Sequence, residues 1–140
     1  MKKLVALLLV AIGSALAVAM MASWPQNVVG TWKGFANQTE VQLVITTQGT
    51  TGSCRSITGT FSNLPSGGAS NIHGFYCPST GRVSFVRTDV DSGAFQSYSA
   101  NLSDVGRESR MAGTFAELNM AGYLGEYNFA VSRPEHSPHP

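Results

Sequence analysis

The chain has 140 residues, a length that predicts a single domain. Only 12% of its residues are charged, and its formal net charge is +1. Both nucleic acid and anionic membrane surfaces are recognised by concentrated positive charge. A near-neutral chain without clusters of Lys and Arg therefore argues against either partner.

The N-terminus has the pattern of a secretory signal peptide over residues 1–22. A Lys-Lys pair precedes an apolar run over residues 4–12, and small residues follow. Three of them are candidate ends of the leader: Ala17, Ala19 and Ala22. Cleavage after Ala22 leaves seven of the nine basic side chains against eight acidic ones, a net charge of −1. We expect a secreted or periplasmic protein with no membrane contact after cleavage.

The two cysteines, Cys54 and Cys77, are expected to form a disulfide, because an even number in an exported chain favours pairing over free thiols. A turn-forming segment over residues 64–68 lies between two strand-like runs. A hairpin folded about residues 65 and 66 pairs positions whose numbers sum to about 131, and these two cysteines fit that sum. The alternative, a redox pair, lacks a C-x-x-C motif and a nearby basic group.

Apolar and polar residues alternate along most of the remaining chain, which indicates half-buried strands and not amphipathic helices. Eight runs follow one another: residues 28–35, 41–46, 56–61, 72–76, 82–87, 95–102, 110–117 and 123–132. Short turns separate them, and a charged loop is expected over residues 104–109. The folded domain is therefore expected over residues 23–133, with residues 134–140 as a disordered tail.

Eight short strands joined by turns predict an antiparallel meander. Closing it removes two unpaired edges, and an eight-stranded barrel is just wide enough for side chains or one small ligand. Gly59, Gly74 and Gly113 fall on the inward faces and suit the bends of a small barrel. We expect an all-β fold, an eight-stranded antiparallel up-and-down β-barrel, with a two-sheet sandwich as the alternative.

Three short motifs occur in order: Gly30-Thr31-Trp32, Ile57-Thr58-Gly59-Thr60-Phe61 and Gly74-Phe75-Tyr76. With the spacing of all eight segments over residues 28–133, they resemble the avidin and streptavidin family. The resemblance implies an avidin-like barrel, and it makes a homo-oligomer built through strands six to eight one expectation.

The biotin-binding residues of that family are largely not matched. Gly34 stands where the family has an Asn, Phe61 replaces a Tyr, and the eighth-strand Asp aligns near Glu126 or Tyr127. Three residues occupy the approximate positions of the pocket tryptophans: Phe85, Tyr98 and Phe115. Biotin has a polar ureido head, and burying it costs about 1–3 kcal/mol for each hydrogen-bond partner that is missing. We therefore expect no high-affinity biotin binding.

The candidate ligand-binding residues share an inward position on the expected strands: Phe61, Phe85, Gln96, Tyr98, Phe115 and Glu117. The aromatic rings form either an apolar pocket or a filled core. Retaining a Tyr98 hydroxyl and a Gln96 amide inside favours a ligand site. Glu117 either points into the barrel mouth, where Arg82 or Arg87 could pair with it, or turns to water.

No catalytic or metal-binding pattern accompanies these residues, so we expect no enzyme, cofactor or metal site. His73 is alone in its strand and is expected to face outward. His136 and His139 are two ligands in a flexible tail, and Asp89 with Asp91 lacks the further oxygen ligands of a calcium loop.

Three functions stay open. The first is a barrel that binds a small apolar or amphipathic ligand other than biotin. The second is a protein-interaction module with a filled barrel, such as a protease inhibitor or an envelope partner. The third is a structural subunit of a larger assembly. We expect the first, in a secreted or periplasmic protein.

Overall fold

The computed structural model describes residues 24–88 and 93–134. The expected signal peptide lies outside these ranges, and so do four residues considered above as metal ligands: Asp89, Asp91, His136 and His139. The last strand continues to Pro134, so this proline belongs to the folded domain and not to the expected tail.

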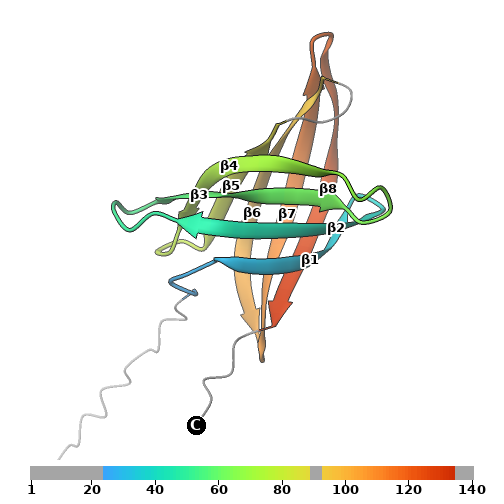
Figure 1. The fold of residues 1–140 in the computed structure, drawn as a ribbon. Coiled ribbons are helices and arrows are strands. Elements are labelled where there is room, and N and C mark those ends of the chain that lie inside the picture. Colours follow the sequence, from blue (N-terminus) through green and yellow to red (C-terminus); the bar gives the residue numbers. More distant parts are fainter. Residues whose placement is uncertain (1–23, 89–92, 135–140) are drawn as a thin grey trace, which may run out of the picture.

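Eight antiparallel strands form one closed barrel, in which sequence neighbours pair and β8 returns to β1 (Figure 1). The strands are β1 (Gly30–Ala36), β2 (Thr39–Gln48), β3 (Arg55–Asn63), β4 (Ala69–Cys77), β5 (Arg82–Arg87), β6 (Phe95–Val105), β7 (Glu108–Asn119) and β8 (Gly122–Pro134). The up-and-down barrel predicted from the sequence is confirmed, and the two-sheet sandwich is excluded. Within the described ranges, no helix is long and apolar enough to cross a membrane.

The charged loop expected over residues 104–109 is wrong. β6 runs to Val105 and β7 begins at Glu108, with a tight turn between them. Gly106 in that turn has a φ of +67°, a left-handed conformation that glycine adopts without steric cost. The polar residues on both sides therefore extend the strand pairing instead of forming a loop.

Side chains alternate between the barrel interior and solvent, as the pleat of a strand requires. Val41, Leu43 and Ile45 on β2 are buried, and the residues between them are more exposed. The largest fully buried side chains are Trp32, Tyr76, Tyr98, Phe61 and Phe129. The core is thus a column of inward-facing rings and aliphatic groups enclosed by all eight strands.

A segment preceding β1, residues 24–28, covers one end of the barrel and is called the strap here. The Trp24 indole donates to the Leu102 carbonyl at 2.8 Å, and the Tyr76 hydroxyl donates to the Pro25 carbonyl at 2.6 Å. Gln48 bonds the strap twice, donating to the Gln26 carbonyl and accepting from the Val28 amide. These contacts hold the strap across what we call the strap end of the barrel.

The predicted disulfide is confirmed: Cys54 and Cys77 are bonded at the strap end, with Cα atoms 4.0 Å apart. Register between β3 and β4 pairs Arg55 with Tyr76, so the cysteines occupy the next pair outward. This is the pairing that the hairpin sum of 131 predicts.

Tyr76 makes the strap end sensitive to high pH. Burial raises the pKa of its phenol from 10.0 to about 12, and the charge of Asp104 acts in the same direction. The protonated phenol therefore stabilises the native state below pH 10.0, and this contribution is lost as the pH rises to about 12. Tyr76→Phe removes the hydroxyl and its hydrogen bond, so we expect its free energy of unfolding at neutral pH to be lower than that of the wild type by about 1 kcal/mol. As the pH rises, the free energy of unfolding should fall less for Tyr76→Phe than for the wild type, because the variant lacks the titrating phenol.

Denaturant unfolding at neutral pH and through the alkaline range, followed by circular dichroism, measures both effects. The same alkaline loss of stability in the two proteins would contradict the assignment of this titration to Tyr76.

Candidate functional site

One row of side chains crosses five strands inside the barrel. Strand register places five residues side by side from β4 to β8: Gly74, Phe85, Tyr98, Phe115 and Tyr127. A Cβ at Gly74 would lie 2.5 Å from the Cβ of Phe85, so the missing side chain makes room for the first ring. The row forms a continuous aromatic layer from β5 to β8.

The rings of this layer pack against one another. The Tyr98 ring stacks on Phe85 and Phe115, with centroids 4.6 and 4.9 Å apart. Phe61 and Phe129 complete the layer, with centroids 5.1 and 5.0 Å from that of Tyr98. Tyr127 is partly buried, and the other five rings of the layer are at most 5% exposed. They pack together as a core, which the sequence left open as the alternative to a pocket.

A second row lies two residues further along the strands, toward the end where β3–β4, β5–β6 and β7–β8 connect. We call this the polar end. Register pairs Gln96 of β6 with Arg87 of β5 and with Glu117 of β7. Gln96 Oε1 accepts from the Tyr98 hydroxyl at 2.8 Å and from Arg87 Nη1 at 3.4 Å, while its Nε2 donates to Glu117 Oε2 at 3.1 Å. One amide thus connects a phenol, a cation and a carboxylate.

Asn63 joins this group from β3. Its Oδ1 accepts from Arg87 Nη1 at 3.1 Å, and the Arg87 guanidinium carbon lies 4.8 Å from the centre of the Phe61 ring. The set is called the polar cluster: Asn63, Arg87, Gln96, Tyr98 and Glu117. Arg87, Gln96 and Tyr98 are 6%, 8% and 1% exposed. Three polar side chains are therefore enclosed at one end of an otherwise apolar core.

The Tyr98 phenol is a fixed donor in the polar cluster. Burial raises its pKa well above the ordinary value of a tyrosine, the Arg87 guanidinium opposes that shift, and the Glu117 charge adds to it. The phenol stays protonated at physiological pH, and its hydrogen bond helps to orient the Gln96 amide.

All six residues predicted for the site lie in or beside the aromatic layer and the polar cluster. Glu117 is partly buried and turned toward Gln96. Among the described residues neither predicted arginine forms an ion pair with it: Arg82 is exposed and donates to Ser99 Oγ at 3.1 Å, and Arg87 bonds Gln96 instead.

Sequence reasoning missed Asn63 and Phe129 and gave Arg87 no part in binding. Asn63 follows Phe61 by two positions, and Arg87 follows Phe85 by two. The same alternation that placed the rings inside therefore carried the signal for both polar residues.

Other candidate features lie away from the polar cluster. His73 is exposed on the outer face of β4, as expected. Two hollows lie on the outside of the wall. One, of about 620 Å³, is lined by residues that include Asn27 and Arg133; the other, of about 510 Å³, includes Phe35 and Arg110. In the described part of the chain, no three His, Cys, Asp or Glu residues gather as metal ligands.

Comparison of the sequence with models of known protein families finds no match, and comparison with curated proteins finds none either. The resemblance to the avidin and streptavidin family accordingly rests on the motifs quoted above.

Proposed function

We propose that this protein is a secreted or periplasmic β-barrel that binds a small amphipathic ligand, other than biotin, at its polar end. The polar cluster carries the proposal, because three of its side chains are more than nine-tenths buried and share one hydrogen-bond network. Apolar residues of similar size would fill this space without the cost of desolvating polar groups. Keeping polar groups at one end of the core favours a ligand as the reason.

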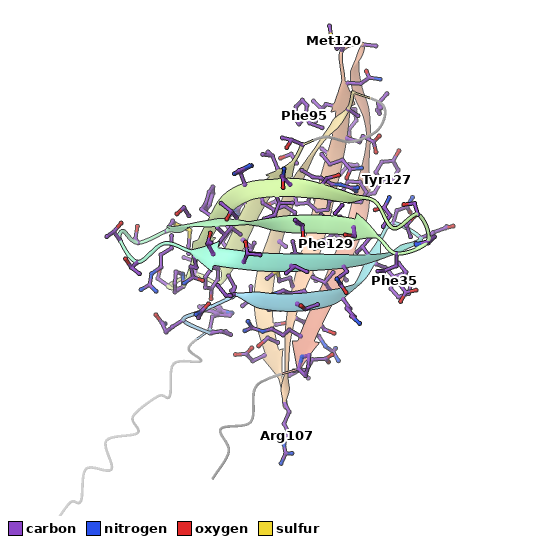
Figure 2. The ribbon with its side chains drawn as sticks, in the orientation of Figure 1. Phe35, Phe95, Arg107, Met120, Tyr127 and Phe129 are labelled. Carbon is purple, nitrogen blue, oxygen red and sulfur yellow. A yellow bond between two sulfur atoms is a disulfide. The ribbon has the colours of Figure 1, made fainter. Side chains whose placement is uncertain are left out.

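The two ends of the barrel differ in how they are covered. The strap lies across one end through several hydrogen bonds. Around the polar end, Phe95 is 44% exposed and Tyr127 is partly buried, with its ring 5.3 Å from that of Phe115 (Figure 2). Phe95 has the outward parity of Ser97 on β6, whereas Tyr127 has the inward parity of Phe129 on β8. The Tyr127 ring therefore supplies apolar surface beside the polar cluster, which is the combination that an amphipathic molecule requires.

Biotin is left out of the proposal because its hydrogen-bond partners are missing, and at position 34 the structure has no room for the missing side chain. The family that the motifs resemble carries an Asn at the position of Gly34. A Cβ at Gly34 would overlap the Ala130 carbonyl oxygen and lie 2.8 Å from the Val131 Cα. An Asn therefore does not fit there unless β1 moves away from β8.

A protein-interaction module is the second candidate, and the β7–β8 hairpin favours it. The tip of this hairpin projects beyond the barrel wall (Figure 2). Met120 at the tip is fully exposed, and Tyr123 and Leu124 are 62% and 49% exposed. Exposed apolar side chains on a projecting hairpin suit contact with another protein.

The proposed compartment is supported by the disulfide, since such bonds persist in oxidising spaces. The signal-peptide pattern of residues 1–22 supports the same location.

The double variant Gln96→Leu with Tyr98→Phe tests the ligand proposal. It removes the amide and the hydroxyl of the polar cluster while keeping side chains of similar volume. We expect the barrel to stay folded, with a stability change of about 1–3 kcal/mol as the Arg87 and Glu117 groups lose a partner. We also expect the variant to lose the small molecule that the wild type retains. Native mass spectrometry of both proteins, purified gently from the compartment in which they accumulate, detects a retained molecule as added mass.

Ser97→Ala is the matched control, because Ser97 lies between these residues on β6 and faces outward. The control is expected to keep the ligand, and biotin is expected to bind the wild type no tighter than micromolar in calorimetry. If the double variant is more stable than the wild type and retains the same molecule, the polar cluster is not the binding site. A wild type that retains no small molecule but captures a protein through the β7–β8 hairpin would favour the second candidate.

A further inference from the structure

Arg87 is the one charged side chain among the described residues that lies buried in the core. Among the described residues its acceptors are neutral: Nη1 donates to the amide oxygens of Asn63 and Gln96, at 3.1 and 3.4 Å. Within the part of the chain that the structure describes, no carboxylate lies within ion-pair distance of Arg87. Its Nε is buried and has no hydrogen-bond partner within residues 24–88 and 93–134.

Among the described residues, hydrogen bonds to neutral amides therefore compensate the positive charge of Arg87 only in part. A buried cation is costly unless it is paired and hydrogen-bonded, and the attraction of the Phe61 ring at 4.8 Å offsets only part of that cost. The bonds to Asn63 and Gln96 both use Nη1, and the guanidinium also hydrogen-bonds the Tyr98 phenol. The edge formed by Nε and Nη2 is the one that can bind two oxygens of a carboxylate side by side.

Glu117 limits how much negative charge the site accepts. Its carboxylate is bonded to the Gln96 amide, which lies between it and Arg87. A singly charged carboxylate next to Arg87 would be separated from Glu117 by that amide. A doubly charged phosphate would meet a larger repulsion, since the Coulomb energy scales with charge.

From these contacts we infer that the ligand of the polar end is a monocarboxylate with an apolar body, and that Arg87 binds its carboxylate. The inference rests on the proposed function and adds the chemical class of the ligand. The apolar body lies against the Tyr127 ring, and the carboxylate takes the Nε–Nη2 edge of the guanidinium. Gln96 and Asn63 then orient Arg87 through its other nitrogen.

Three probes of equal chain length test this: decanoate, decanol and decylamine, each titrated into the full chain by calorimetry below its aggregation concentration. We expect the wild type to bind decanoate roughly tenfold to a hundredfold tighter than decanol, the range set by hydrogen bonds to a charged group. Decylamine should bind more weakly than decanol, because its cation would face Arg87.

Arg87→Met should abolish the preference for decanoate over decanol. Arg87→Lys should retain part of that preference, because lysine keeps the charge but cannot bind two carboxylate oxygens side by side. Arg82→Met is the control on the same strand, since Arg82 is exposed and donates to Ser99 outside the polar cluster. It should bind decanoate as the wild type does. Circular dichroism establishes that each variant is folded before it is titrated.

Equal affinity for decanoate and decanol in the wild type, or an unchanged preference in folded Arg87→Met, would overturn the role of Arg87 while leaving the proposed function in place. So would a wild type that binds no probe but retains a molecule without a carboxyl group from its own compartment; retention of an apolar monocarboxylic acid there would support the inference. Binding of no probe together with no retained molecule would overturn both proposals.

Discussion

Replacing Gly59 with alanine is expected to destabilise the barrel by about 3 kcal/mol or more, because the added methyl group has no space. A Cβ at this position would overlap the Val44 carbonyl oxygen and lie 3.0 Å from the Ile45 Cα on β2. Both obstacles are backbone atoms of a paired strand, so they cannot turn aside as a flexible side chain could. Equilibrium unfolding in urea measures the loss.

Gly68→Ala is the control for this prediction. Gly68 lies in the β3–β4 connection, where a Cβ would meet no atom within 4 Å. A surface substitution of this kind changes stability by about 0.5 kcal/mol at most. If Gly59→Ala unfolds at the same urea concentration as Gly68→Ala, β2 and β3 are less closely packed than the structure shows.

Gly59 is one of four glycines on the inner face of the barrel at which a Cβ would overlap a backbone carbonyl oxygen of the next strand: Gly34, Gly59, Gly74 and Gly113. Such close approach occurs where strands bend sharply to close a small barrel. At Gly59 the bend coincides with a register shift in β2 between Ile45 and Thr47. The sequence predicts three of the four as inward positions where the strands bend. Gly34 was noted only as the position at which the avidin and streptavidin family has an Asn.

The fold could be predicted because the alternation of apolar and polar residues is regular enough to place all eight strands. The ends of the strands could be predicted less accurately. Residues 103–105 are exposed and mostly polar, and their pairing with residues 108–110 follows from the tight turn at Gly106. Ser109 is buried there and donates to Asp104 Oδ1 at 2.8 Å. Closure of the meander into a barrel was inferred from the cost of free edges, and the pairing of β8 with β1 confirms it.

The aromatic layer could also be predicted, since Phe85, Tyr98 and Phe115 share the inward parity of their strands. The contacts within the polar cluster could not be predicted from the sequence. Whether Arg87 turns inward depends on the acceptors that two other strands place around it, Asn63 from β3 and Gln96 from β6. A charged residue at the end of a strand is usually solvated, so alternation alone did not outweigh that expectation.

Removing the disulfide is expected to lower the free energy of unfolding by about 3 kcal/mol. The bond joins residues separated by 23 positions, and in the chain-entropy model closing a loop of this length restricts the unfolded chain by about that amount. Cys54→Ser with Cys77→Ser should therefore unfold at a clearly lower urea concentration than the wild type. Mass mapping of the unreduced wild type should show the two cysteines joined.

Two comparisons separate the loss of the bond from the chemistry of the replacements. Cys77 is buried and Cys54 is exposed, so a serine hydroxyl placed at position 77 adds a desolvation cost of its own. Cys54→Ala with Cys77→Ala lacks that hydroxyl, and it should be destabilised by nearly the same amount if the bond is what matters. A reductant should lower the stability of the wild type toward that of the alanine pair and leave both double variants unchanged. A reduced wild type as stable as the oxidised protein would mean that the pairing of β3 with β4 already restrains this hairpin in the unfolded chain, so that the bond adds little.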